Sequence, residues 1–423
     1  DPLLRFGGEG ETQAADLGPS LRRHNPTMPF PPEEQVLSAR WVFPVSGPPL
    51  ANGTVTVRGD RITSVDPAGA RSPDTDLGNA AIIPGLVNAH THLDLTGMRG
   101  AIPPRPDFVG WLRDVVAYRR SRTPEEVAAD VRAGLDECLR TGTTLIGDIS
   151  AGGLSWGALA GAPVWAVCFR EVLGLPAGRV PTAWADLGRW VEEHPDTPTC
   201  RAGVSPHAPY SVHKAMIEAA ARLWPVCIHL AESTAECELL DRRTGPLVPF
   251  LREMGVWDPS GLAPSWDWVV WKASRAPAAL FAHGNYLSPA TRLPPNSTIV
   301  YCPRTHAAFN HPRHPFAEFV SRGARVALGT DSLASNPDLD LLAEARLIHE
   351  RYPDLPGDQL LRMATLSGAE ALGFSDVTGS LDAGKSADLV VISLPGEDGQ
   401  EPHKLLFQAG ARAEKTMWRG RWR

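Results

Sequence analysis

The chain has 423 residues, of which 43% are hydrophobic and 21% are charged. This composition excludes a disordered or fibrous protein and predicts a globular one with a large core. A net charge of −7 argues against binding to nucleic acid or to an anionic membrane, so we expect a small-molecule partner instead. The six cysteines show no C-x-x-C spacing, which indicates reduced thiols in a cytoplasmic protein.

Both ends of the chain differ in pattern from its middle. Residues 1–34 contain charges, prolines and glycines without the apolar core of a signal peptide, and we expect a disordered extension there. From residue 35 to 80, short apolar runs separated by Gly-Pro and Asn-Gly turns predict small antiparallel strands. Residues 374–423 return to this pattern, so we predict one small β-sandwich domain assembled from both chain ends.

The middle of the chain, residues 81–373, repeats a short apolar run, a polar loop and a helical segment. Eight such runs occur, at residues 81–92, 143–150, 163–172, 199–207, 226–232, 278–286, 297–306 and 325–332. Continuous apolar strands that alternate with helices predict a parallel sheet covered on its outside, and eight of them predict a (β/α)₈ TIM barrel.

A doubly wound open sheet is the competing architecture, and the polar residues decide against it. Barrel enzymes carry their chemistry on the face where many different strands end. Eleven polar or charged residues lie at or just after the predicted strand ends: His90, His92, Asp148, Glu171, His207, His229, Glu232, His283, Arg304, His306 and Asp331.

One helix that covers the barrel is predicted clearly by its ends. Thr123, Pro124 and Glu126 match a capping box with proline at the first helical position. Apolar residues follow at helical spacing, and Gly142 ends the segment.

Histidines and a carboxylate at strand ends predict a metal site. His90 and His92 are two residues apart, so on a strand they point to the same side. This pair alone is weak evidence, because two hydrogen-bonded loop histidines would give the same pattern. His229, His283 and Asp331 end three further strands, and three imidazoles with a carboxylate suit a catalytic divalent ion.

Six segments in order then resemble the amidohydrolase superfamily. They read PGLVNAHTHLD (84–94), PHAPYSV (206–212), HLAES (229–233), AHGNYLS (282–288), LGTDSLASN (328–336) and GSLDAGKSADLVVI (379–392). The resemblance covers about residues 35–423. Within the superfamily, the chain is most similar to the branch of methylthioadenosine/adenosylhomocysteine, aminofutalosine and guanine deaminases and triazine hydrolases.

The resemblance implies one divalent ion, held by His90, His92, His229 and Asp331. Some superfamily members hold two ions bridged by a carboxylated lysine at the end of strand four. No lysine precedes Lys214 in this chain, so that strand cannot supply one, and we expect a single ion. Zn²⁺ is the expected metal, with Fe²⁺ or Mn²⁺ as alternatives.

The resemblance also implies catalytic roles for three residues. Asp331 would take a proton from the attacking water, and Glu232 would pass a proton to a ring nitrogen of the substrate. His283 would hold the metal-bound hydroxide and stabilise developing charge. The alternatives are a solvated glutamate for Glu232 and a hydrogen-bonded core histidine for His283.

Candidate substrate contacts follow the other strands. His207 lies in the strand-four segment and is the first choice, against the alternative of a structural histidine. The segment from Cys302 to His306 departs from the C-P-x-S-N pattern of methylthioadenosine-type deaminases, and a loop role is favoured for the following HPRH run (311–314) over a second metal site. The remaining candidates for substrate contact are Trp111, Arg170, Glu171, Arg304 and His306.

The expected activity is hydrolytic deamination of an aminopurine base or nucleoside, similar to aminofutalosine or an adenosine derivative, by attack of a metal-bound hydroxide. The alternative is hydrolysis of another carbon–nitrogen or carbon–chlorine bond in a triazine-like or cyclic amide substrate. A non-catalytic barrel is the third possibility, because a fold does not fix a function. The family resemblance further implies a homo-oligomer, which we expect to be a dimer.

Overall fold

A sheet of eight parallel strands forms the centre of the protein. The computed structural model describes residues 34–396 and 401–423, so the predicted extension lies outside the described residues except for Glu34. The sheet has the strand order β15-β14-β13-β12-β11-β10-β9-β8. Its strands are β8 (Leu86–Thr91), β9 (Thr143–Ala151), β10 (Trp165–Val172), β11 (Cys200–Pro206), β12 (Val226–Leu230), β13 (Ala279–His283), β14 (Ser297–Tyr301) and β15 (Arg325–Leu328).

The sheet closes on itself almost completely. The first and last strands meet just beyond β15, where Thr91 and Asp331 form a parallel bridge. The backbone amide of Asp331 donates a hydrogen bond of 3.0 Å to the carbonyl of His90. The predicted TIM-type barrel is therefore confirmed, and the ends of β8 and β15 lie side by side at its mouth.

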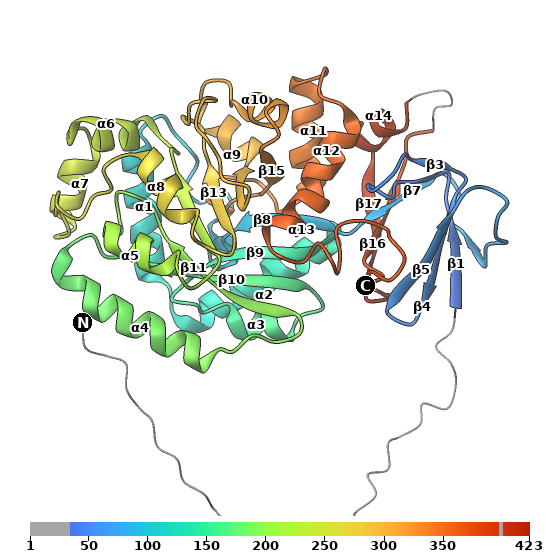
Figure 1. The fold of residues 1–423 in the computed structure, drawn as a ribbon, viewed down its shortest axis with the longest axis horizontal. Helices are drawn as coiled ribbons and strands as arrows, with labels where there is room; N and C mark the ends of the chain where they lie inside the picture. Colours follow the sequence, from blue (N-terminus) through green and yellow to red (C-terminus); the bar gives the residue numbers. More distant parts are fainter. Residues whose placement is uncertain (1–33, 397–400) are drawn as a thin grey trace, which may run out of the picture. The chain divides into compact units, whose positions relative to one another are not determined.

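Helices follow the barrel strands and surround them, as Figure 1 shows for α1 to α8. The capping box of α2 is present, with Thr123 and Glu126 each accepting the other's backbone amide. The helices are α1 (Phe108–Ser121), α2 (Pro124–Arg140), α3 (Trp156–Gly161), α4 (Val180–Glu193), α5 (Lys214–Ala220), α6 (Thr234–Arg242), α7 (Leu247–Glu253), α8 (Trp266–Ala273), α9 (Pro303–Ala308), α10 (Phe316–Ser321), α11 (Leu341–Arg351), α12 (Gly357–Ala364), α13 (Leu366–Ala371) and α14 (Pro402–Phe407), with short 3₁₀ turns η1 (Leu93–Met98) and η2 (Ala177–Arg179). None of the helices in the described ranges has the length and apolar character needed to cross a membrane.

Two further sheets contain the strands of the chain ends, and the larger of them is built from both ends. One has the order β5-β4-β1-β6 and the other β18-β17-β16-β7-β2-β3, which joins N-terminal and C-terminal strands (Figure 1). Their strands are β1 (Glu34–Ser38), β2 (Trp41–Val42), β3 (Leu50–Ala51), β4 (Thr54–Arg58), β5 (Arg61–Asp66), β6 (Thr75–Asp76), β7 (Ala80–Pro84), β16 (Leu389–Ser393), β17 (Arg412–Trp418) and β18 (Arg421–Trp422). The domain boundaries at residues 35, 81 and 374 stay a prediction.

Two of the predicted strands differ from the observed ones. The run 81–92 is split at Gly85 into β7, which pairs with β16, and β8, which enters the barrel. A side chain at Gly85 would lie 1.9 Å from the Thr144 hydroxyl, so only glycine fits at this crossing. The run 297–306 ends as a strand at Tyr301, because Pro303 begins α9 at its first helical position.

Candidate functional site

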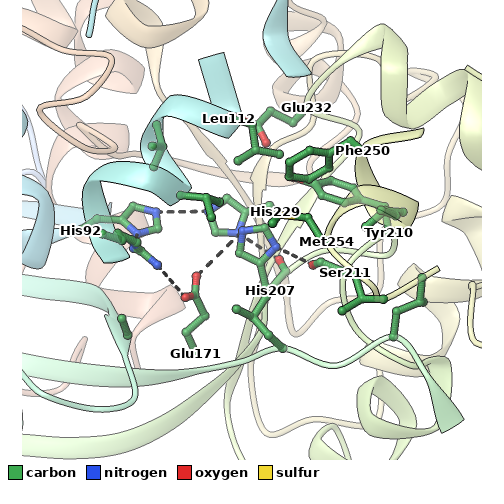
Figure 2. A pocket seen from close by; sticks show the side chains of 18 of the residues that line it. His92, Leu112, Glu171, His207, Tyr210, Ser211, His229, Glu232, Phe250 and Met254 are labelled. Carbon is green, nitrogen blue, oxygen red and sulfur yellow. Dashed lines mark hydrogen bonds and ion pairs between the residues drawn. The ribbon is translucent and has the colours of Figure 1, made fainter. Parts of the chain in front are cut away.

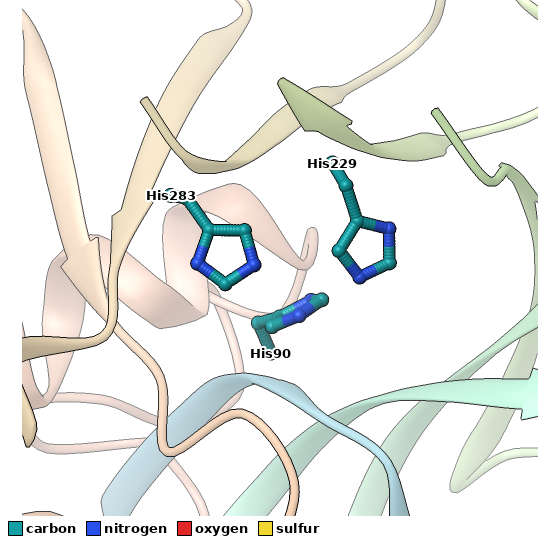
Figure 3. A group of neighbouring side chains, drawn as sticks. All are labelled: His90, His229 and His283. Atoms are coloured by element: carbon teal, nitrogen blue, oxygen red, sulfur yellow. The ribbon is translucent and has the colours of Figure 1, made fainter. Parts of the chain in front are cut away.

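Four side chains from three different strand ends converge at the barrel mouth. His90 and His92 come from the end of β8, His229 from β12 and Asp331 from the segment after β15. The Nε2 atoms of His92 and His229 are 3.2 Å apart, and Oδ1 of Asp331 is 3.6 Å from Nε2 of both His90 and His92. Figure 3 shows the rings of His90, His229 and His283 facing one another.

Backbone conformation directs two of these residues into the mouth. The backbone at Asp331 (φ 58°) and at His283 (φ 70°) is in the left-handed conformation, which residues other than glycine rarely adopt. The Asp331 segment is held by three hydroxyls. Ser335 donates to Oδ2 at 2.9 Å, and Thr91 and Thr330 donate to the backbone carbonyl at 3.1 and 3.2 Å. Such strain is typical of functional sites, where surrounding contacts hold the unusual conformation.

The donor atoms are in the protonation states that a cation needs. Nδ1 of His229 donates to the carbonyl of His207 at 2.9 Å, which leaves the Nε2 lone pair free. Burial lowers the pKa of His92 to about 3 and that of His229 well below its usual value. Burial raises the pKa of Asp331, but the neighbouring imidazoles outweigh this effect, and the net shift is downward. The neutral imidazoles of His92 and His229 therefore face an ionised carboxylate.

This set of residues fits a divalent ion. Nε2 of His90 is fully buried and has no hydrogen-bond partner, which is costly unless another group satisfies it. Ligand atoms of His90, His92 and Asp331 all lie within 4.8 Å of one another. Three imidazole nitrogens and one carboxylate oxygen match the ligands that zinc and similar ions take in catalytic sites.

Glu232 and His283 form a second pair beside this cluster. Oε1 of Glu232 is 3.6 Å from Nε2 of His283, and both side chains are buried. Glu236 holds the Glu232 segment by accepting the backbone amides of Ala231 at 2.9 Å and Glu232 at 3.0 Å. Burial, together with the charges of Asp331 and Glu236, raises the pKa of Glu232 well above its usual value. This shift favours the protonated carboxyl group, which is the form that can donate a proton.

A cavity of about 580 Å³ opens over the cluster (Figure 2). Its size is within the range of pockets that enclose a small ligand. Polar groups such as His207 and Glu171 lie on one side, and a wall of apolar side chains from α1 and α7 lies on the other. The apolar wall includes Phe108, Trp111, Leu112, Val115, Phe250, Leu251 and Met254.

The structure brings only part of the predicted substrate contacts to this cavity. His207 and Trp111 line it. Arg170, Arg304 and His306 do not line it, and their contact with a substrate stays a prediction. Successive side chains on a strand point to opposite sides, so Glu171, the neighbour of Arg170 on β10, points into the barrel mouth.

Arg304 and His306 lie on α9, which begins at Pro303, and both contact other partners. Arg304 forms a bidentate ion pair with Asp338. Its Nη1 donates to Oδ1 at 2.5 Å, and its Nη2 donates to Oδ2 at 3.0 Å. His306 bonds to the carbonyl of Pro312 at 2.8 Å and lines a different cavity. Both side chains are thereby turned away from the catalytic mouth.

Glu171, a predicted substrate contact, also lines the cavity, whereas Arg119 and Arg179 were not predicted from the sequence. Glu171 forms an ion pair with the half-buried Arg119 at 2.8 Å, and Oε1 of Glu171 lies 3.9 Å from Nε2 of His207. Nδ1 of His207 is 2.6 Å from the Ser211 hydroxyl. The strand-end position of Glu171 was a usable signal, whereas Arg119 on α1 and Arg179 on η2 reach the cavity from segments whose place only the fold defines.

The Ser335 hydroxyl provides a test of how the Asp331 carboxylate is held. Replacing Ser335 by alanine is expected to lower metal affinity about 10- to 100-fold, as loss of a group that orients a ligand commonly does. A titration at buffered concentrations of free metal, with enzymatic activity as the readout, would measure the change in metal affinity. Ser321→Ala is the matched control, because Ser321 is exposed at the end of α10. This variant should bind metal like the unaltered protein.

The fold and the donor set together define a class, the TIM-barrel enzymes with a divalent-metal site at the strand ends. A model of the Amidohydrolase family matches residues 81–423. The chain belongs to the amidohydrolase family, whose members are metal-dependent hydrolases, and it acts as a hydrolase on carbon–nitrogen bonds.

Three similar proteins show where in the family the chain lies. It is 30% identical over 393 residues to the 5-methylthioadenosine/S-adenosylhomocysteine deaminase of Moorella thermoacetica, covering 86% of this chain and 85% of that protein. It is 28% identical to the aminodeoxyfutalosine deaminase of a Nitratiruptor species, covering 75% and 80%. The zinc-bound crystal structure of an adenosine deaminase from Xanthomonas campestris has a TM-score of 0.74 and 25% identity, covering 92% of each chain.

Proposed function

We propose that this protein deaminates an adenine-type nucleoside by hydrolysis and releases ammonia. The observation that carries the proposal is the buried Glu232 carboxyl group beside the cluster of His90, His92, His229 and Asp331, in a cavity with an apolar wall. Deamination of an aminopurine needs a nucleophilic water, an acceptor for its proton and an acid for the ring nitrogen. The similarity to deaminases of adenine nucleosides supports the same reaction.

The proposed cofactor is one zinc ion held by the three imidazoles of His90, His92 and His229 and by the Asp331 carboxylate. When bound, such an ion lowers the pKa of a coordinated water toward neutrality. The similarity to a zinc-bound adenosine deaminase supports zinc over iron or manganese. Oδ1 of Asp331 lies 3.6 Å from Nε2 of both His90 and His92, so the carboxylate would be close to a water on the ion and could accept its proton.

The proton transfers follow from the opposite pKa shifts of the two carboxyl groups. Asp331 is ionised and accepts the proton of the attacking water, whereas Glu232 is protonated and donates to the substrate ring nitrogen. His283 is neutral, since burial lowers its pKa to about 3, and its buried Nε2 has no hydrogen-bond partner. It is therefore free to hydrogen-bond the oxygen that attacks the ring.

The apolar wall would hold the base, and Trp111 is its largest member. Replacing Trp111 by alanine is expected to raise KM about tenfold, because stacking of a base on an aromatic ring contributes about 1–3 kcal/mol. Steady-state kinetics would separate this effect from kcat, which should change less. Trp271→Ala is the control, because that side chain is 54% exposed on α8 and does not line the cavity.

Ammonia release from a substrate panel tests the proposed reaction. The panel comprises adenosine, methylthioadenosine, adenosylhomocysteine, aminofutalosine and guanine, each with the metal-loaded protein. We expect at least one adenine nucleoside to release ammonia at a rate that depends on Glu232. Ammonia from none of them would contradict the proposal and favour a triazine-like or cyclic amide substrate.

A further inference from the structure

The HPRH run (311–314) lies in the loop between α9 and α10, and the proposed reaction assigns it no role. No residue of the run lines the catalytic cavity. Its last residue, His314, is fully buried, and its ring stacks on Tyr301 of β14 with 4.0 Å between the ring centres. His314 instead reaches the catalytic residues through the main chain.

The His314 side chain donates a hydrogen bond to the backbone of His283. Its Nε2 lies 2.7 Å from the His283 carbonyl oxygen, and a carbonyl oxygen only accepts, so Nε2 carries the ring proton. Nδ1 of His314 is then a lone-pair acceptor, and among the described residues it has no hydrogen-bond partner. Such a buried, unpaired nitrogen is costly, so packing alone would favour an apolar side chain at this position.

The carbonyl that accepts this bond belongs to a strained turn. At His283 φ is 70°, and the Gly284 amide donates both to the carbonyl of Ala282 at 3.1 Å and to that of Leu230 at 2.9 Å. A three-residue turn with a positive φ at its centre is the rare and strained form of the γ-turn, and surrounding contacts must hold it. His314 supplies one of these contacts, to the residue whose ring faces the histidine cluster (Figure 3).

The other end of this turn is held as well. Nδ2 of Asn285 donates to the backbone carbonyl of Glu232 at 2.9 Å. The Tyr286 hydroxyl lies 3.0 Å from Nδ1 of His311, the first residue of the HPRH run. The run therefore contacts both ends of the turn 283–286, and this turn is bonded to the strand end that carries the proposed acid.

We propose that His314 is a positioning residue for the reaction. It contacts no substrate. Through the backbone carbonyl of His283 it holds the turn that aims Nε2 of His283 at the oxygen attacking the substrate ring. The inference rests on the proposed function, because the role of His283 belongs to that reaction.

Two substitutions of His314 separate its hydrogen bond from its packing. Leucine has nearly the size of histidine but donates no hydrogen bond, whereas glutamine carries an N–H group at the same number of bonds from the backbone. His314→Leu is expected to lower kcat about 10- to 100-fold with little change in KM, because a displacement of about 1 Å can slow catalysis this much. His314→Gln should keep most of the rate, and both variants should keep the metal content of the unaltered protein.

His194→Leu is the matched control. Nδ1 of His194 also bonds to a main-chain carbonyl, that of Trp190 at 2.7 Å, but His194 lies at the end of α4 and does not line the catalytic cavity. This variant should turn over like the unaltered protein.

A double variant tests whether His314 acts through His283. His283→Ala alone should lower kcat about 100- to 1000-fold, as loss of a group that stabilises developing charge does. Since two groups that act through one another are not additive, His283→Ala/His314→Leu should be no slower than His283→Ala. A further loss equal to that of His314→Leu alone would show an independent structural effect and would overturn the proposal.

NMR of the histidine rings tests the same link without turnover. In the metal-free protein, labelled with carbon-13 at Cε1 of histidine, the signal missing from His283→Ala identifies His283. This signal should shift in His314→Leu and stay in place in His314→Gln. An unchanged His283 signal in His314→Leu would also overturn the proposal. If His314→Leu does not fold, His314→Asn takes its place, because the asparagine amide is one bond too short to reach the His283 carbonyl.

Failure of the proposed function would be visible separately. It would appear as the absence of ammonia from the substrate panel with the unaltered protein, whereas the NMR comparison needs neither substrate nor metal.

Discussion

Replacing Glu232 by glutamine is expected to lower kcat about a thousandfold while the metal content stays unchanged. Glutamine keeps the size and polarity of the side chain but cannot donate an acidic proton, and acid–base catalysis of this kind contributes about 10²–10⁴-fold. Glu232 lies 3.6 Å from His283 but is not among the proposed metal ligands, so binding and catalysis should separate. Ammonia release and elemental analysis of the same preparation would measure both.

The matched control for this variant is Glu125→Gln, an exposed glutamate in the first turn of α2. It should keep full activity. An active Glu232→Gln variant would show that another group supplies the proton and would contradict the role assigned to Glu232. Loss of metal in the same variant would instead place Glu232 among the groups that hold the ion.

Replacing His229 by alanine is expected to abolish both metal binding and turnover. His229 supplies the Nε2 atom 3.2 Å from that of His92, and its ring is fixed through the His207 carbonyl. Without an ion, water keeps its pKa of about 15.7 instead of about 7, so turnover should fall by more than about a thousandfold. Metal analysis after dialysis, together with activity at saturating zinc, would measure the loss.

His349→Ala is the control for the His229 variant, because His349 is half-buried on α11 and is not among the proposed metal ligands. It should retain about one ion per chain and normal activity. Chelation of the unaltered protein should reproduce the inactive state of His229→Ala, and added metal should restore activity only to the unaltered chain.

The sequence could predict the barrel and the central cluster because both depend on local patterns. The spacing of His90 and His92 places two imidazoles on one side of a strand, and apolar runs before His229 and Asp331 mark the ends of parallel strands. In a barrel all such ends meet at one mouth, so linear positions become neighbours in space. The structure brings these four residues together, and their roles as ligands stay a proposal that metal analysis can test.

The predicted substrate contacts that do not line the catalytic cavity depended on contacts beyond the strand ends. Arg304 and His306 follow a predicted strand, but Pro303 begins a helix that turns both away from the mouth. Arg170 faces away because its neighbour Glu171 takes the inward position. Arg119 reaches the site from α1. The sequence pattern of a helix does not show which carboxylate an arginine on it will pair with, here Glu171.

The dimer, the cytoplasmic location and the choice of zinc stay predictions. They depend on surfaces, cellular context and metal supply, which a pattern of strands and ligands does not encode. The metal itself is the most useful of these to determine, since the proposed reaction depends on it.

Anomalous X-ray scattering from crystals of the metal-loaded protein tests the central claim most directly. We predict a single metal peak per chain, at about 2.0–2.2 Å from Nε2 of His90, His92 and His229 and from a carboxylate oxygen of Asp331. A protein that is active without bound metal, or a peak that none of these four side chains contacts, would contradict the account.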